Sequence, residues 1–130
     1  MSYEWIEHTA EVELAVEAKT PSGVFEEALR ALAELAGPAA GDPVTQEVEL
    51  EAPDIPALLV AWLEEILYLE ETESCVFDEA DVAVSGAASL SATLRGRRGE
   101  PRPLVKAVTY HGLTIAERDG QWIARVVLDV

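Results

Sequence analysis

The segment from Asp54 to Leu69 carries the pattern that most restricts how this chain can fold. Asp54 is the kind of residue that caps a helix by accepting a hydrogen bond from a backbone N–H group. Apolar residues then recur at intervals of three and four, which is the spacing of one broad helix face: Ile55, Leu58, Leu59, Trp62, Leu63, Ile66, Leu67 and Leu69. We therefore predict an amphipathic helix of about four turns that begins after Asp54.

A second helical pattern lies closer to the start of the chain. Thr20 and Pro21 supply a capping residue and a first-turn proline, and Gly37 stops the pattern. The apolar residues between them again follow helical spacing: Val24, Phe25, Ala28, Leu29, Leu32, Leu35 and Ala36. This pattern predicts a helix from Pro21 to Ala36.

Most of the remaining sequence alternates with the two-residue period of a β-strand. The dipeptide Asp119-Gly120 between the last two alternating runs is a strong hairpin signal. The predicted strands cover residues 10–18, 44–51, 76–85, 89–95, 104–116 and 121–130.

Two helices among many strands favour the α+β class. We predict a two-layer arrangement, with a mixed or antiparallel sheet and both helices packed on one face. At 130 residues and 49% hydrophobic content the chain can bury one core, which predicts a single domain over residues 1–130. In such a sheet the strand 10–18 and the last strand can both be interior, which would anchor a chain end that otherwise tends to fray.

Charge and cysteine content restrict the function. The 25 acidic and 9 basic residues give a formal net charge of −16, which opposes direct binding to nucleic-acid phosphates and favours a cation or a basic protein as partner. The alternative is an acidic surface that only keeps the chain soluble. Cys75 is the only cysteine, so an intrachain disulfide is excluded. No secretory signal or membrane-length apolar run is visible, which predicts a cytoplasmic protein that does not contact membranes.

Three short segments could carry chemistry. In the first, residues 7–11, His8 lies near Glu7 and Glu11, but strand periodicity puts His8 and Glu11 on opposite faces unless the strand starts late or bulges. In the second, residues 105–113, Lys106 and His111 interrupt an apolar strand. The alternatives are solvated acids near a chain end, a lysine that balances a carboxylate, and a histidine beside a bulge.

The third segment is the chain end, where Asp129 precedes the carboxylate of Val130. If the strand 10–18 pairs with the last strand, Glu11 joins this group. Oxygen ligands without a thiolate suit Ca²⁺, Mg²⁺ or Mn²⁺ better than Zn²⁺. Either a metal ion or a salt bridge to Lys106 or Arg125 would relieve the repulsion among these acids.

Five of the nine basic residues fall between Arg95 and Lys106. They form either a local patch for a phosphate, a nucleic acid or an acidic partner, or a mobile loop kept soluble by arginine. Neither a nucleophile elbow nor a phosphate-binding glycine loop occurs in the sequence.

Three segments in order along the chain resemble the archease family: EHTAEVEL near the start, LLVAWLEEILYL in the second helix, and VKAVTYHGL followed by WIARVVLDV at the end. The resemblance implies a small α+β protein that is not itself an enzyme. It implies an accessory role for the RtcB-type RNA-splicing ligase, in which the protein promotes guanylylation of the ligase and its repeated turnover in tRNA splicing.

The resemblance also implies roles for particular residues. Glu11, Asp129 and Val130 correspond to a divalent-metal site, with Ca²⁺ or alternatively Mg²⁺ or Mn²⁺, and Lys106 corresponds to the family's functional lysine. We expect His8 and His111 to belong to the same partner contact. The family motif usually has aspartate where this chain has Glu11, whose side chain reaches about one methylene further. The chain has therefore either kept the metal with shifted geometry or lost it and kept the partner contact.

Two other functions compete with this hypothesis. One is a general chaperone or binding module for RNA-processing enzymes, without a functional metal site. The other is a metal-dependent hydrolase that uses Glu11, His111 and Asp129.

Overall fold

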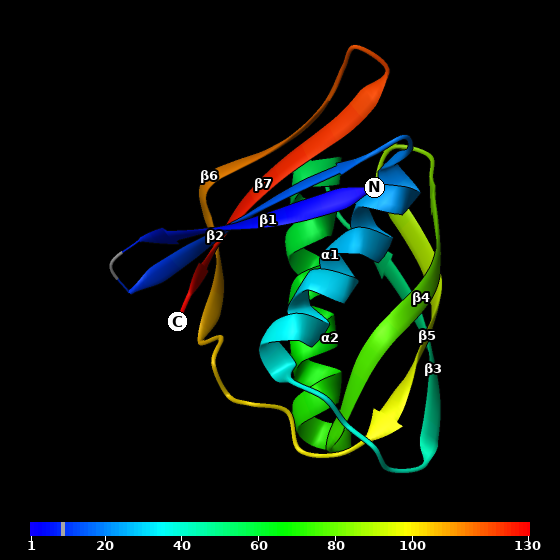
Figure 1. Ribbon diagram of the computed structural model, residues 1–130. Coiled ribbons are helices and arrows are strands. Elements are labelled where there is room, and N and C mark those ends of the chain that lie inside the picture. Colours follow the sequence, from blue (N-terminus) through cyan, green and yellow to red (C-terminus); the bar gives the residue numbers. More distant parts are fainter. Residues whose placement is uncertain (9) are drawn as a thin grey trace.

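The computed structural model describes residues 1–8 and 10–130, and of His8 it describes the backbone only. Two antiparallel sheets lie on either side of two helices (Figure 1). One sheet has the strand order β1-β2-β7-β6 and the other has the order β3-β5-β4. The elements along the chain are β1 (Ser2–His8), β2 (Glu11–Ala18), α1 (Pro21–Ala36), β3 (Pro43–Glu51), α2 (Ile55–Glu73), β4 (Cys75–Ser85), β5 (Ser89–Arg98), β6 (Ala107–Arg118) and β7 (Gln121–Asp129).

The α+β class, the antiparallel pairing and the two helices agree with the sequence prediction. The layering differs, because the strands form two sheets and each helix contacts both of them, which gives three layers instead of two. The physical reason is the burial of α2, whose buried residues extend around much more than one face: Leu58, Leu59, Val60, Trp62, Leu63 and Ile66. A helix that is apolar on two sides needs cover on two sides.

Both helices begin where their capping residues predict. The side chain of Thr20 accepts a hydrogen bond from Gly23 N at 3.0 Å, and that of Asp54 accepts one from Ala57 N at 2.8 Å. Helix α1 ends before Gly37, as predicted. Helix α2 runs one turn beyond Leu69 and ends at Ser74, which adopts the left-handed conformation. The prediction stopped short because residues 71–73 are exposed and polar, and so break the apolar pattern without breaking the helix.

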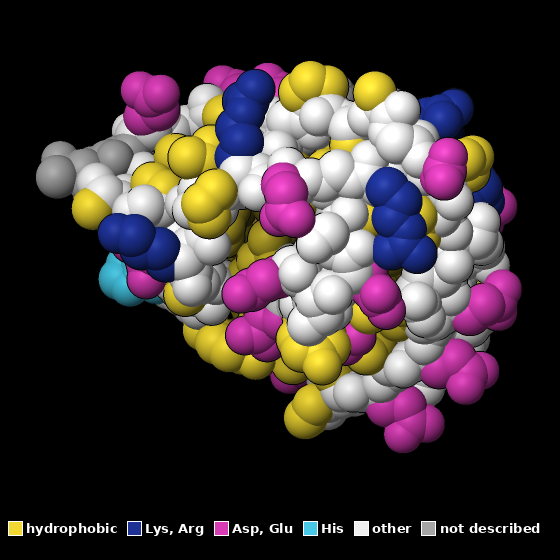
Figure 2. All heavy atoms as spheres, turned by 90° about the horizontal axis from the view of Figure 1, so that it is seen from below, with side chains coloured by type: hydrophobic (Ala, Val, Ile, Leu, Met, Phe, Trp, Pro, Cys, Tyr) yellow, Lys and Arg dark blue, Asp and Glu magenta, His cyan; other side chains and the backbone are white. Residues whose placement is uncertain are grey.

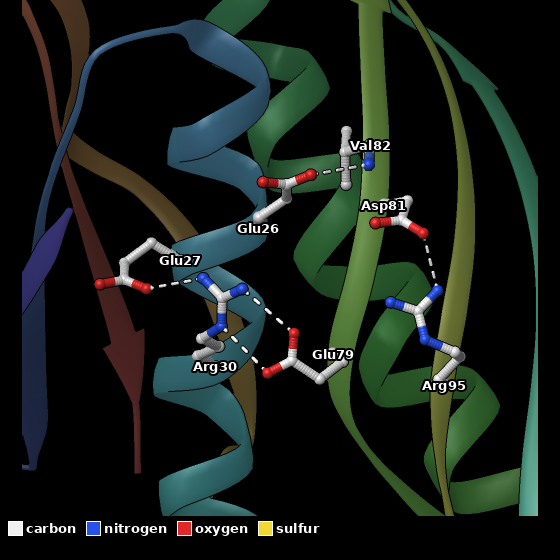
Figure 3. A network of polar contacts seen from close by, with 7 residues as sticks. All are labelled: Glu26, Glu27, Arg30, Glu79, Asp81, Val82 and Arg95. Carbon is white, nitrogen blue, oxygen red and sulfur yellow. Dashed lines mark hydrogen bonds and ion pairs between the residues drawn. The ribbon is translucent and has the colours of Figure 1, made fainter.

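Polar side chains of α1 fix this helix to the second sheet, of which β4 is an edge strand (Figure 3). An edge strand presents backbone N–H groups that lack a strand partner. Two of these groups are satisfied by α1 at 3.0 Å, that of Val82 by Glu26 and that of Val84 by Ser22. An ion pair between Arg30 of the helix and Glu79 of the strand adds to this attachment.

The last strand, β7, is interior to its sheet, as predicted, with β2 on one side and β6 on the other. Strand β1 was not predicted. It pairs with β2 at the sheet edge, and Tyr3 and Trp5 pack against the core. At the surface, the Tyr3 hydroxyl donates a hydrogen bond to Glu34 of α1. This bond and partial burial raise the pKa of Tyr3 to about 12.

Glu70, near the end of α2, is an acidic residue inside the core. Its side chain is only 2% exposed, and its Oε2 atom accepts a hydrogen bond from Phe77 N at 2.9 Å. Burial raises the pKa of Glu70 to about 7, although the hydrogen bond from Phe77 opposes this rise. The folded protein therefore keeps a proton at Glu70 over a pH range in which the unfolded chain has lost it.

Glu70 should make the stability of the protein depend on pH. Between about pH 4.5 and 7 the folded state binds more protons than the unfolded state, so the free energy of unfolding should fall as pH rises through this range. A Glu70→Gln variant keeps an acceptor for Phe77 N and cannot ionise. It should be more stable than the original protein at pH 8, by on the order of 1–3 kcal/mol, and lose this advantage near pH 5.

Urea unfolding at pH 5, 6, 7 and 8 measures this difference. Glu64→Gln is the matched control, because Glu64 is an exposed acid of the same helix. A constant difference between Glu70→Gln and the original protein at all four pH values would contradict the prediction.

Candidate metal site at the chain end

Strands β2 and β7 place Glu11 directly opposite Asp129. Residues that face each other in an antiparallel pair share one side of the sheet, with Cβ atoms about 4.5–5.5 Å apart. Leu14 and Leu128 alternate with these acids and are buried against the helices. Glu11 and Asp129 therefore lie on the outer face of the first sheet, at the end where the chain stops (Figure 1).

Two backbone hydrogen bonds fix the chain end on both sides. Lys106 N donates to the carbonyl of Asp129 at 2.7 Å, and Val130 N donates to the carbonyl of Ala10 at 3.2 Å. The last residue is thus held between the start of β2 and the segment that leads into β6. Val130 consequently follows Asp129 at a defined place. We call Glu11, Asp129 and Val130 the terminal site.

The acids of the terminal site have no counter-charge in the described part of the chain. Neither Glu11 nor Asp129 makes an ion pair or a side-chain hydrogen bond with any residue that the structure describes. Arg125, which could have neutralised them, is bound to Glu13 at 2.5 Å. Lys106 is exposed and, within the same described residues, also forms no ion pair. Like charges directly opposite each other on paired strands are destabilising, so this arrangement attracts a cation.

The donor atoms determine which cation fits. Carboxylate oxygens suit Ca²⁺, Mg²⁺ or Mn²⁺. Among the side chains that the structure describes, no group of three His, Cys, Asp or Glu residues could hold a metal ion. Glu11 and Asp129 alone would leave the ion largely hydrated. The backbone also fixes Val130 beside them, so the donor set fits a hard cation when the carboxylate of Val130 takes part.

His111 is not brought together with the terminal site. His111 is exposed in the irregular part of β6, where its N–H group donates to the side chain of Thr109 at 3.3 Å. It follows Ala107, which pairs with Asp129, by four residues, or roughly 13 Å of strand. The structure therefore does not assemble Glu11, His111 and Asp129 into a hydrolase site. The side chain of His8 lies outside the described residues, although its backbone pairs with Glu11.

The arginine-rich segment after residue 94 mainly makes contacts within the chain. Arg95 forms an ion pair with Asp81 at 2.8 Å. Arg97 and Arg98 donate to backbone carbonyls, those of Gly41 at 3.2 Å and Glu73 at 2.8 Å. These three arginines lie in β5, so they belong neither to a mobile loop nor to a free phosphate-binding patch.

The pair formed by Glu13 and Arg125 was not predicted, although it lies beside the terminal site on the same sheet face. Strand periodicity already places Glu11 and Glu13 on one face. Which base meets which acid depends on the register between β2 and β7, where Glu11 faces Asp129 and Ala15 faces Arg125. The sequence contains no separate signal for that register.

Comparison with known proteins identifies the family. The model of the Archease protein family matches residues 3–130. The chain belongs to the archease family. It is 35% identical to the archease of Methanosarcina barkeri, over 98% of this chain and 95% of that protein. It is 36% identical to the archease of Methanopyrus kandleri, over the full length of both.

Solved structures share the fold. The solution structure of Methanobacterium thermoautotrophicum protein 1598 is 29% identical, with a TM-score of 0.74 over 98% of both chains. The crystal structure of a Thermotoga maritima archease, described as a possible chaperone, is 23% identical, with a TM-score of 0.71 over 96% of this chain and 94% of that one. In this archease, no helix of the described residues is long and apolar enough to cross a membrane.

Repulsion at the terminal site should be measurable as stability. In metal-free buffer at low salt, Asp129→Asn should increase the free energy of unfolding by about 0.2–1 kcal/mol, because it removes one of two facing carboxylates. The gain should shrink as salt is added. Urea unfolding at low and high salt measures both effects.

Glu17→Gln is the control for this prediction. Glu17 is an exposed acid of the same strand, and it faces Ile123 instead of another acid. Equal gains in the two variants would mean that the effect comes from the overall negative charge and not from the facing pair.

Proposed function

We propose that this archease is an accessory protein of the RtcB-type RNA-splicing ligase. It promotes guanylylation and repeated turnover of the ligase in tRNA splicing or RNA repair, in the cytoplasm, and is not itself the ligase. The observation that carries the proposal is the register of Glu11 opposite Asp129 at an anchored chain end. Family membership supports it, and so do the strand pairing and backbone hydrogen bonds that join Glu11, Asp129, Val130 and the backbone of Lys106.

We further propose that Glu11, Asp129 and Val130 hold a divalent cation, with Ca²⁺ as the leading candidate and Mg²⁺ or Mn²⁺ as alternatives. When bound, the ion would supply positive charge and further oxygen-binding positions at the surface that meets the ligase. The longer side chain of Glu11 is compatible with Ca²⁺, whose coordination geometry is flexible. The backbone bonds of Lys106 and Val130 keep the donor groups in place.

Lys106 has a second role in this proposal. Its backbone is tied to Asp129, and its exposed ammonium group is unpaired among the residues that the structure describes. A lysine in this position can contact an anionic group of the partner, such as a phosphate in the guanylylation site. The net charge of −16 suits an approach to a basic RNA-binding cleft and opposes the holding of RNA by this protein itself.

A ligation assay with the cognate ligase at substoichiometric concentration tests the proposal. The original protein should give repeated turnover, whereas Asp129→Ala should lower the rate about tenfold or more while leaving the fold intact. Glu17→Gln should stimulate like the original protein. Ligase that has already been guanylylated should complete one turnover without any archease, which separates the guanylylation step from the sealing step.

The outcomes separate the two candidate functions. Equal stimulation by the original protein and by Asp129→Ala would contradict a role for the terminal site. It would favour a general chaperone, the function suggested for the Thermotoga maritima relative. No stimulation by either protein would contradict the ligase as partner.

Metal binding is tested without the ligase. After dialysis against a chelator, millimolar Ca²⁺ should raise the melting temperature of the protein by several degrees, because a ligand that binds only the folded state stabilises it. Asp129→Ala should show no such rise, and neither should a variant with added residues after Val130, since the extension moves the terminal carboxylate. An unchanged melting temperature of the original protein at millimolar Ca²⁺, Mg²⁺ and Mn²⁺ would contradict the metal site.

A further inference from the structure

A cavity of about 610 Å³ lies where the two helices end, and neither Glu11 nor Asp129 lines it. Leu35 and Ala36 of α1 and Leu67 and Glu70 of α2 line it, and the segment 100–105 between β5 and β6 covers part of it. This is the lower end of the molecule in Figure 1. Seen from below, that end is hollowed, with hydrophobic side chains in the recess and acidic side chains at its edge (Figure 2).

Glu70 places a carboxyl group in the lining of the cavity, and only one of its two oxygens accepts a hydrogen bond from the described residues. One carboxylate oxygen, Oε2, accepts the hydrogen bond from Phe77 N. The other, Oε1, accepts none from any residue that the structure describes. Because Glu70 is 2% exposed and lines the cavity, the cavity is the space from which a donor can reach Oε1. Among the polar side-chain atoms of the described residues, only Trp5 Nε1 is both enclosed and without a partner, so water in the cavity can reach Oε1. A ligand that carries a donor would replace this water.

The surroundings select a positively charged donor. Both helices point their C-terminal ends, which carry partial negative charge, toward the cavity, and neither has a basic residue in its last turn. Glu71 and Glu100 add two acids to the lining, and Arg102 is the one base among the lining residues that the structure describes. The cavity is therefore negative overall.

The walls select an organic cation over a metal ion. They are mainly aliphatic and proline side chains, and the volume falls in the range of small-molecule sites. A divalent metal needs about six or more oxygen ligands, whereas most side chains that line this cavity are apolar, and no three acids of the described residues are grouped closely enough to hold a metal ion. An ammonium group needs only a few acceptors, and its hydrocarbon body would replace water against the apolar walls.

We propose that this cavity binds a small organic cation, an ammonium group on an aliphatic body, with the ammonium donating to Oε1 of Glu70. The raised pKa of Glu70 agrees with this assignment, since it reflects a buried carboxylate that lacks a positive partner. Binding at this cavity does not require the ligase, so a test of the cavity is independent of any test of the proposed function.

Hexylammonium is the probe for this site, and 1-hexanol is the neutral control of equal length. Calorimetric titration at pH 8 in 0.3 M NaCl measures both, with the salt present to screen the acidic surface. Hexylammonium should bind saturably to one site, about tenfold or more tightly than 1-hexanol. No saturable binding of hexylammonium, or equal binding of the two probes, would overturn the proposal.

Three variants locate the binding. Glu70→Gln should remove the preference for hexylammonium over 1-hexanol, whereas Glu64→Gln, an exposed acid of the same helix outside the cavity lining, should retain it. Leu35→Trp should abolish binding of both probes by filling the cavity while Glu70 stays intact. Far-ultraviolet circular dichroism checks that each variant is folded. Undiminished hexylammonium binding in both Glu70→Gln and Leu35→Trp would place it on surface acids and overturn the assignment.

Discussion

The register between β2 and β7 is the constraint on which the candidate site depends. Buried leucines and valines alternate with Glu11 and Asp129 along these strands, and a slip of one residue would turn the acids into the core. The cost of burying two carboxylates excludes that slip. The hydrophobic pattern thus keeps both acids on the outer face, and the pairing of β2 with β7 sets them opposite each other without any direct attraction between them. Two carboxylates that repel each other stay side by side here because the buried residues of β2 and β7 hold these strands together.

The sequence predicted those features that depend on residues close to one another along the chain. Helix α1 has the predicted bounds because Thr20 and Gly37 act within one turn of its ends. The division into two sheets was missed because it depends on how far burial extends around α2, which a one-face pattern does not report. Strand pairing is non-local in the same way. The sequence could name Glu11, Asp129 and Lys106, but only the register shows that Arg125 binds Glu13 and leaves the terminal acids uncompensated.

Negative charge in this protein is organised differently at two places. At the terminal site the acids lie on an outer sheet face, where water and a hydrated cation can reach them. At Glu70 the acid is enclosed, and the ends of two helices add to its negative field. The first environment suits a hard metal ion with several oxygen ligands, and the second suits a cation that carries its own apolar surface. The net charge of the protein does not distinguish these two environments.

The segment between β5 and β6 connects these two places. Its Arg102 N donates to the carbonyl of Ala36 at the end of α1, and its Lys106 N donates to the carbonyl of Asp129 at the chain end. Val105, the residue before Lys106, lines the cavity that contains Glu70. Backbone hydrogen bonds fix this segment at Arg102 and at Lys106, so one short stretch of chain forms part of the cavity wall and also holds the end of β7.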